Sequence, residues 1–188
     1  MMNFINKFDS SILLFIKDNM NGAIMDKIMV LFTSLGNGGA VWIIIAVILM
    51  INKKYRKIGF MALVALLLTT ILGEGVLKNL VQRIRPCEAI PAVNLLISKP
   101  LTYSFPSGHT ASSFAVAGVL AKYLKKYAIG FFSLALLIAF SRLYLYVHYP
   151  TDVLAGMILG LLCSVVVIFI FNKIENNKKK IHIKEEWN

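Results

Sequence analysis

A stretch that ends near residue 150 combines residue types suited to nucleophilic and acid–base chemistry. It runs from Ser141-Arg142 through His148 to Asp152. Asp152 follows His148 by four residues, so its carboxylate can hydrogen-bond the imidazole, fix the ring tautomer and support positive charge on it. Arg142 lies inside an apolar run, where a charge is costly unless it is paired or functional. The alternative is a structural Arg142–Asp152 pair beside an unrelated histidine, but we favour a catalytic histidine–carboxylate unit.

A second cluster, Pro106-Ser107-Gly108-His109, precedes a short apolar segment. Ser107 is suited to cap the start of a helix, and Gly108 lets the backbone approach a ligand closely. Free N–H groups at a helix start bind phosphate, so His109 would lie beside a phosphate bound there. The alternative is a capped helix that happens to carry an interfacial histidine.

A third cluster supplies cations that could hold such a phosphate. Lys78 and Arg85 are seven residues apart, close to two helical turns, which predicts a shared helical face and a separation of about 10 Å along the axis. Pro86 disfavours helix at the residue before it, so the helix is predicted to end there. The alternative is that both cations only snorkel to the membrane surface. Glu74, one turn before Lys78, predicts an intrahelical ion pair, with a substrate-sensing acid as the alternative.

The composition indicates a membrane protein. Of the 188 residues, 58% are hydrophobic and only 15% are charged, whereas about a quarter of the residues in a soluble domain are charged. The net charge of +11 could indicate nucleic-acid binding, but the hydropathy argues against it. Positive charge beside apolar segments more often faces anionic lipid headgroups. No linker or repeat divides the chain, so residues 1–188 are predicted to form one domain.

Five apolar segments are candidates for membrane-spanning helices, which need about 20 apolar residues. They are Ile28–Ile51, Ile58–Leu77, Gly108–Leu124, Ala128–Val147 and Val153–Phe171. The first contains Gly36-Asn37-Gly38-Gly39, which predicts a kink or break. The third is short and rich in small residues, which let helices pack closely in lipid. The predicted fold is therefore an all-α, polytopic membrane helix bundle of about five spans.

Residues 1–22 precede these spans and contain an amphipathic pattern. Apolar side chains fall on one face of a helix at Phe4, Ile5, Phe8, Ile12, Phe15 and Ile16. This pattern predicts a helix that lies on the membrane surface. A helix packed on the bundle explains the pattern equally well, so both alternatives stay open.

The distribution of basic residues predicts the orientation. Twelve of the twenty basic residues fall on one side of the five spans: Lys53, Lys54, Arg56, Lys57, Lys122, Lys125, Lys126, Lys173, Lys178, Lys179, Lys180 and Lys184. By the positive-inside rule this side, with the basic tail 173–188, is cytoplasmic. The N-terminus and the loop 85–106 are then outside, and the three clusters meet at the outer membrane face.

The three clusters together resemble the type 2 phosphatidic acid phosphatase (PAP2) superfamily. The resemblance rests on Lys78…Arg85-Pro86, Pro106-Ser107-Gly108-His109 and Ser141-Arg142…His148…Asp152. It implies a bacterial plasma-membrane phosphatase that acts on a lipid without a metal or other cofactor.

The resemblance also implies roles for single residues. His148 would attack phosphorus to give a phosphohistidine, Asp152 would orient and activate it, and His109 would protonate the leaving oxygen. The groups expected to hold the phosphoryl oxygens are Lys78, Arg85, Arg142 and the amides near Ser107 and Gly108. The residues expected to support them are Glu74, Pro86, Pro106 and Ser141.

These motifs recognise a phosphate and leave the lipid tail open. Undecaprenyl diphosphate is our first expectation for the substrate, with phosphatidate or phosphatidylglycerophosphate as alternatives. A transporter for an anionic lipid is a different class of hypothesis, because buried charges would suit a substrate path. The expected partners are the lipid substrate and membrane lipids, without nucleic acid. No feature of the sequence indicates an oligomeric state.

Overall fold

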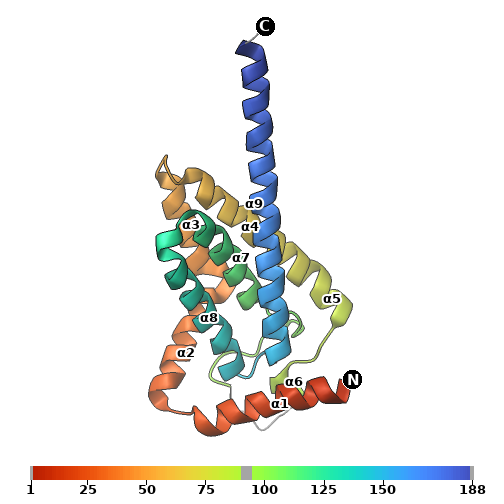
Figure 1. The fold of residues 1–188 in the computed structure, drawn as a ribbon. Coiled ribbons are helices and arrows are strands. Elements are labelled where there is room, and N and C mark those ends of the chain that lie inside the picture. Colours follow the sequence, from red (N-terminus) through yellow and green to blue (C-terminus); the bar gives the residue numbers. More distant parts are fainter. Residues whose placement is uncertain (1, 90–94, 187–188) are drawn as a thin grey trace.

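The computed structural model describes the backbone of residues 2–89 and 95–186, and the side chains of residues 4–89 and 95–178. Every regular element within these residues is helical, which confirms the predicted all-α class (Figure 1). In chain order the elements are α1 (Met2–Asn19), α2 (Ala23–Gly36), η1 (Asn37–Gly39), α3 (Ala40–Ile51), α4 (Arg56–Thr70), η2 (Ile71–Leu77), α5 (Lys78–Val81), α6 (Pro86–Ala89), α7 (Gly108–Tyr123), η3 (Lys125–Tyr127), α8 (Ala128–Tyr144) and α9 (Pro150–Glu186).

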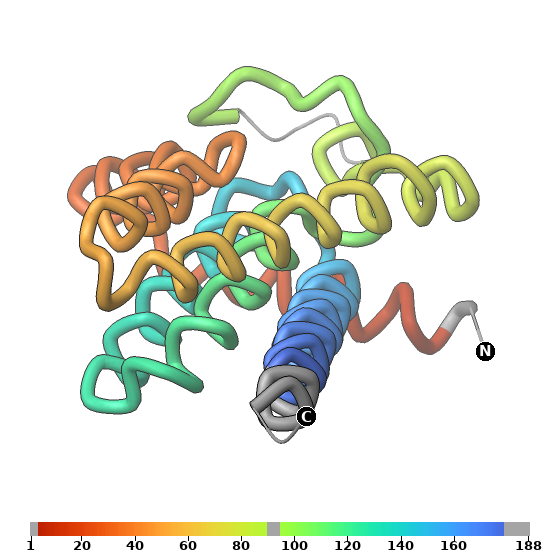
Figure 2. The backbone as a smooth tube through the Cα atoms, turned by 90° about the horizontal axis from the view of Figure 1, so that it is seen from above, coloured from red at the N-terminus to blue at the C-terminus, as the bar shows by residue number. Residues whose placement is uncertain are grey.

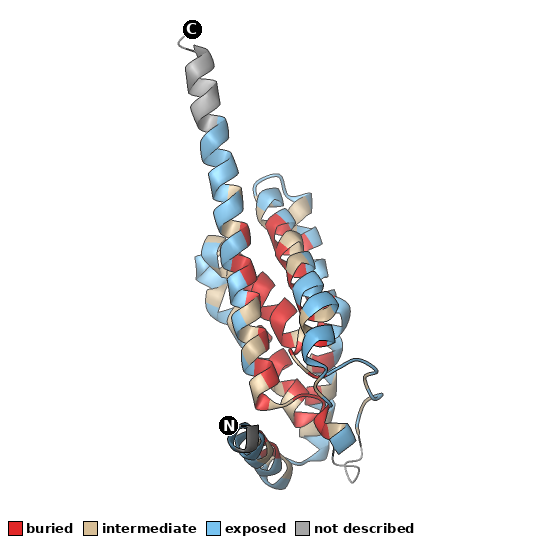
Figure 3. Ribbon diagram, turned by 90° about the vertical axis from the view of Figure 1, so that its right-hand side faces the viewer, coloured by how far each residue is buried: buried red, intermediate tan, exposed pale blue. Residues whose placement is uncertain are grey.

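Four helical segments of the described residues are long and apolar enough to cross a membrane. They are Ala23–Ile51, Arg56–Ala89, Lys125–Tyr144 and Pro150–Lys178. The third predicted span, Gly108–Leu124, corresponds to α7, which has only 16 residues and buries most of its side chains. It packs against α4, α8 and α9 (Figure 2). The buried residues gather in the interior of the bundle (Figure 3). Because neighbouring helices cover α7, its surface does not need the apolar character of a helix that faces lipid.

Small residues bring α7 and α9 close together. A Cβ atom added at Gly160 would collide with the backbone oxygen of Ala111 and lie 2.8 Å from the nitrogen of Ala115. One added at Gly156 would lie 2.7 Å from the carbonyl oxygen of Ser107. This contact fixes the starts of the two helices, which carry the second and third sequence clusters, beside each other.

The first span is broken where the glycine-rich sequence predicts a break. Gly38 and Gly39 have φ values of 58° and 72°, in the left-handed region that favours glycine. The turn η1 formed here separates α2 from α3 and brings Asn37 next to His109.

The second span contains two irregularities, and one of them corrects a prediction. Residues 71–77 form a π-helix, a feature that is frequent at functional sites. The helix then ends at Val81, because Gln82 adopts a left-handed conformation with φ of 50°. The prediction that Lys78 and Arg85 share a helical face, with the helix continuing to Pro86, was therefore wrong. Instead, Pro86 occupies the first position of α6, where its fixed φ is suitable.

The N-terminal helix α1 lies across the end of the bundle at which α7 and α9 begin (Figure 1). Asp9, Leu13 and Ile16 face the bundle and are buried, whereas Phe4 and Phe15 are 76% and 63% exposed. The helix thus packs on the bundle with one stripe and presents aromatic side chains on another. The contact with the bundle agrees with one of the two alternatives left open by its sequence, and contact with the membrane surface stays a prediction.

The predicted basic tail from residue 173 is not separate from the last span. The described backbone of α9 continues as one helix to Glu186, and Lys57 forms an ion pair with Glu175 beyond the apolar part. The described end of α9 lies at the opposite end of the bundle from α1 (Figure 1).

Gly160→Ala should destabilise the protein, because the added methyl group meets backbone atoms of α7 that cannot move independently. Overpacking of this kind costs about 1–3 kcal/mol, so we expect a lower thermal unfolding temperature in detergent. Gly130→Ala is the matched control, since Gly130 is exposed on α8 with open space around it. Equal unfolding temperatures for the two variants would contradict the close contact of α7 with α9.

Candidate active site

A cavity of about 300 Å³ lies at the end of the bundle where α7 begins. It is lined by Gly36, Gly38, Gly39, Leu66, Thr69, Thr70, Gly73, Glu74, Lys78, Arg85, Pro100, Thr102, Gly108, His109, Ser112, Arg142 and His148. Residues from all three sequence clusters therefore meet in one place. The predicted site residues that do not line it are Pro86, Pro106, Ser107, Ser141 and Asp152.

His148 is 2% exposed and is flanked by a cation and a carboxylate. Its Nε2 lies 3.1 Å from Nη1 of Arg85, and its Nδ1 lies 3.6 Å from Oδ2 of Asp152, which is longer than a hydrogen bond. Burial lowers the pKa of His148 to about 3, with Arg142 and Arg85 contributing and Asp152 opposing the shift. The ring is therefore neutral near pH 7. Since Arg85 can only donate, Nε2 holds a lone pair and the ring proton is on Nδ1, toward Asp152.

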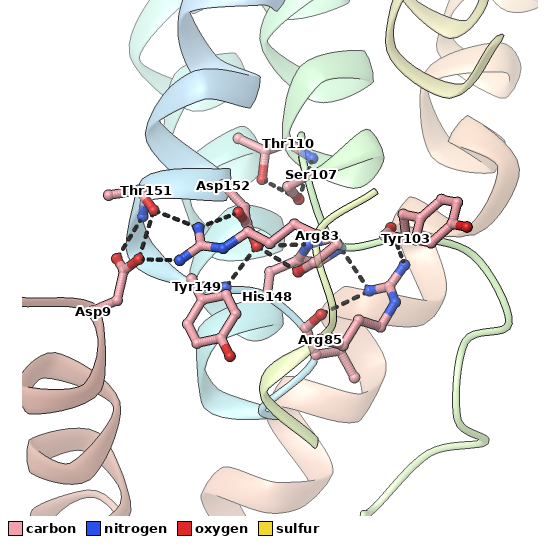
Figure 4. A network of polar contacts seen from close by, with 12 residues as sticks. Asp9, Arg83, Arg85, Tyr103, Ser107, Thr110, His148, Tyr149, Thr151 and Asp152 are labelled. Atoms are coloured by element: carbon pink, nitrogen blue, oxygen red, sulfur yellow. Dashed lines mark hydrogen bonds and ion pairs between the residues drawn. The ribbon is translucent and has the colours of Figure 1, made fainter. Parts of the chain in front are cut away.

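The Asp152 carboxylate is held by other partners. Its Oδ2 accepts hydrogen bonds from Ser104 Oγ at 2.5 Å and from the Tyr149 amide at 2.9 Å. Its Oδ1 accepts one from Arg83 at 2.7 Å (Figure 4). The structural Arg142–Asp152 pair considered as an alternative does not form, because Arg83 occupies that place.

Backbone carbonyls fix the guanidinium of Arg85. It donates to the carbonyl oxygens of Thr102 and Val147, each at 2.7 Å, and of Tyr103 at 3.1 Å. Lys78 donates to Glu74 at 2.8 Å, which is the predicted ion pair, and to the Thr102 hydroxyl at 3.0 Å. Arg85 and Lys78 both donate to the hydroxyl of Thr102. A loop residue therefore holds the two cations beside each other, although they do not share a helical face.

Arg142 is a buried cation without an acidic partner. It is 3% exposed, and Nη1 donates to the hydroxyl of Thr33. Among the described side chains no ion pair involves Arg142, and its Nε has no hydrogen-bond partner. A buried charge is costly unless it is compensated. Since this one borders a cavity that also contains Lys78 and Arg85, the cavity is suited to a multiply charged anion.

The start of α7 has the predicted cap. Thr110 N–H donates to Ser107 Oγ, although the distance of 3.5 Å is long, and the two hydroxyls are 2.9 Å apart. His109 extends into the cavity with Nε2 2.9 Å from Oδ1 of Asn37. A Cβ atom at Gly108 would overlap a carboxylate oxygen of Glu74, so glycine allows the π-helix to approach this helix start.

Several residues of the site lack a clear signal in the sequence. Thr102 and Ser104 lie in an irregular loop, where no periodicity indicates which way a side chain points. Arg83 could have been identified from the extended segment before Pro86. In such a segment alternate residues face the same side, and Arg83 and Arg85 point inward while Ile84 is 60% exposed.

No group of three or more metal-ligating side chains occurs in the part of the chain that the structure describes. The expectation of a reaction without a metal stays a prediction.

The fold and the site define a helical membrane protein with a cavity lined by three cations and two histidines, and comparison with known proteins identifies the family. A family model described as PAP2 superfamily matches residues 57–175, so the chain belongs to the PAP2 superfamily. An undecaprenyl-diphosphatase from Sulfolobus acidocaldarius is 36% identical over 140 residues, covering 73% of this chain and 66% of that protein.

Two solved structures share the fold and at least a quarter of the sequence. Aquifex aeolicus LpxE has a TM-score of 0.75 and 30% identity over 86% of this chain and 94% of that one. A PAP2 type phosphatidylglycerolphosphate phosphatase from Bacillus subtilis has a TM-score of 0.74 and 27% identity over 92% of this chain and 88% of that one. The chain spans 58–66% of the length of the first three curated relatives it matches.

Arg142→Met should weaken the binding of inorganic phosphate by about 10- to 100-fold, because a hydrogen bond to a charged group contributes about 1.5–3 kcal/mol. Titration calorimetry of the purified protein measures this change. Arg56→Met is the control, since Arg56 is exposed at the start of α4, far from the cavity lining. If both variants bind phosphate like the wild type, Arg142 does not contribute to phosphate binding in the cavity.

Proposed function

We propose that this protein is an integral membrane phosphatase that removes phosphate from a lipid through a covalent intermediate on His148. One observation carries the proposal: the neutral Nε2 of His148 lies 3.1 Å from Arg85 in a cavity that also contains two other cations and a second histidine. A nucleophile, an acid and compensating charges are the groups that phosphoryl transfer requires. Membership of the PAP2 superfamily supports the same reaction.

In the first step, the lone pair on Nε2 of His148 forms an N–P bond while the P–O bond to the lipid breaks. The leaving oxygen takes a proton from His109. The side-chain oxygen Oδ1 of Asn37 lies 2.9 Å from Nε2 of His109, and this contact orients the ring toward the cavity. The Nδ1 proton of His148 is directed at Asp152, whose carboxylate stabilises the charge that develops on the ring.

In the second step, water attacks phosphorus, the N–P bond breaks and inorganic phosphate leaves. His109 takes the proton of the attacking water and so returns to its initial state. Throughout both steps Lys78, Arg85 and Arg142 hold the phosphoryl oxygens and compensate the charge of the transition state. No metal ion takes part in this mechanism.

Undecaprenyl diphosphate is our first proposal for the substrate. The name of the Sulfolobus relative supports it. Phosphatidylglycerophosphate is the second candidate, supported by the name of the Bacillus subtilis structure. That structure matches 92% of this chain at 27% identity, whereas the Sulfolobus relative matches 73% at 36% identity. A panel assay of the purified protein on these two lipids and phosphatidate decides between them. In vesicles, lipid movement without phosphate release would instead indicate the transporter.

We infer that the cavity opens outside the cytoplasm and that the C-terminus is cytoplasmic. The junctions α3–α4 and α7–α8, which carry Lys53, Lys54, Lys125 and Lys126, lie at the opposite end of the bundle from α1 (Figure 1). Basic loops favour the cytoplasmic side, so the end that contains the cavity is expected outside.

His148→Ala should lower lipid phosphate release by about 1,000-fold or more, because loss of a nucleophile removes the covalent route. Phosphate release by the purified, folded variant is measured with a colorimetric assay. His182→Ala, which alters a histidine outside the three motifs, is the control and should keep wild-type activity. Near wild-type turnover by the His148 variant would show that the nucleophile has been assigned wrongly.

Activity should survive EDTA, because protein cations neutralise the phosphate in the proposed mechanism. Phosphate release is measured before and after chelation, and again after divalent ions are added back. Complete loss that is restored by added Mg²⁺ or Ca²⁺ would rule out a reaction without a metal.

A further inference from the structure

Asp9 is a buried carboxylate outside the three sequence clusters. It belongs to α1, has an exposed fraction of 0%, and lies outside the residues 57–175 that match the family model. It accepts hydrogen bonds from the Thr151 amide at 3.0 Å, from the Thr151 hydroxyl at 2.7 Å and from Arg83 at 2.6 Å. Burying a charge is unfavourable unless partners of this kind compensate it. An apolar residue at position 9 would pack against the bundle without this cost, so the carboxylate calls for an explanation other than packing.

Arg83 connects this carboxylate to the candidate catalytic one. Its Nη2 donates to Asp9, and its Nη1 donates to Oδ1 of Asp152 at 2.7 Å and to the Thr151 hydroxyl at 2.7 Å (Figure 4). The guanidinium lies 4.0 Å from the centre of the Tyr149 ring, which restricts it further. The planar fork of arginine suits two carboxylates at once, whereas the point charge of lysine does not.

The contacts with Asp152 determine how it faces His148. Arg83 holds Oδ1, while Ser104 and the Tyr149 amide hold Oδ2, the oxygen that lies 3.6 Å from His148. Without Arg83, Oδ1 would lose this support and the carboxylate would be held through Oδ2, which leaves its orientation toward the imidazole less restricted.

We propose that Asp9 and Arg83 are positioning residues, through which α1 holds Asp152 in the orientation that His148 needs for attack. The inference rests on the proposed function, because it assumes that His148 is the nucleophile. Neither residue lines the cavity that holds His148. Both therefore act on the chemical step through Asp152, and phosphate binding by Lys78, Arg85 and Arg142 is unaffected.

Asp9→Asn is the informative substitution, because it keeps the size of the side chain. The neutral amide can still contact Thr151, but it no longer presents a negative charge to Arg83. Misplacement of a supporting group costs about 10- to 100-fold in rate, so we expect kcat to fall by that factor. KM should change by less than about 2-fold. Asp18→Asn is the matched control, since Asp18 is an exposed acid on the same helix.

Arg83→Lys tests the fork separately, because lysine keeps the charge but cannot bridge both carboxylates. Its kcat should fall like that of Asp9→Asn. The double variant should be little worse than the poorer single variant, since both remove one connected support. Additive losses in the double variant would overturn the proposal that the two residues act together.

A structural tether alone would give a different result. Asp9→Asn would then lower the unfolding temperature while the folded fraction kept wild-type kcat on dioctanoyl phosphatidate, and the inference would be wrong.

A second readout does not depend on the lipid. Orthovanadate mimics the five-coordinate transition state, so its affinity, measured by vanadium NMR, should fall at least about 10-fold in Asp9→Asn, while the affinity for inorganic phosphate stays constant.

The two readouts separate this inference from the proposed function. If the wild-type protein neither hydrolyses the lipids nor binds vanadate, the proposed function fails first. If the wild type does both and Asp9→Asn is indistinguishable from Asp18→Asn in each, only the positioning role is overturned.

Discussion

The energetic cost of charged side chains among apolar helices is the constraint that organises this structure. At the end of the bundle that contains the cavity, most buried charges have a compensating partner. Lys78 lies against Glu74, and Arg83 bridges Asp9 and Asp152. Arg142 differs, because among the described side chains it has no ion pair and donates to the hydroxyl of Thr33. An anion bound in the cavity would compensate its charge, as the proposed function requires.

Irregular backbone is concentrated around this cavity. The break at η1, the π-helix η2 and the early helix end at Val81 all occur beside it, whereas α3, α8 and α9 are regular. Each irregularity moves a side chain that a straight helix would place elsewhere. Asn37 reaches His109, Glu74 meets Gly108, and Arg85 enters from an extended segment. Non-helical backbone within membrane depth is tolerated where it borders a polar cavity.

The sequence predicts the chemistry of the site better than its geometry. His148, His109 and Arg142 could be selected from residue type and spacing, and they do border one cavity. The shared helical face of Lys78 and Arg85 was wrong, because a left-handed residue at Gln82 ends the helix before the proline that marks the boundary in sequence. Asp9 could not be found, since its role depends on a contact with residues more than seventy positions away. Hydropathy likewise predicts helices that face lipid and gives little information about α7, which neighbouring helices enclose.

The two halves of the candidate site come from different parts of the chain. The groups proposed to face the phosphate come from residues 74–148, within the region that matches the PAP2 superfamily. Part of the support for Asp152 comes from α1, which lies outside that region. The proposed reaction depends on the first set of residues, whereas the orientation of the proposed nucleophile also depends on the position of α1. On the proposed positioning role, a shift of α1 would reach His148 through three successive contacts, from Asp9 to Arg83, from Arg83 to Asp152, and from Asp152 to the imidazole.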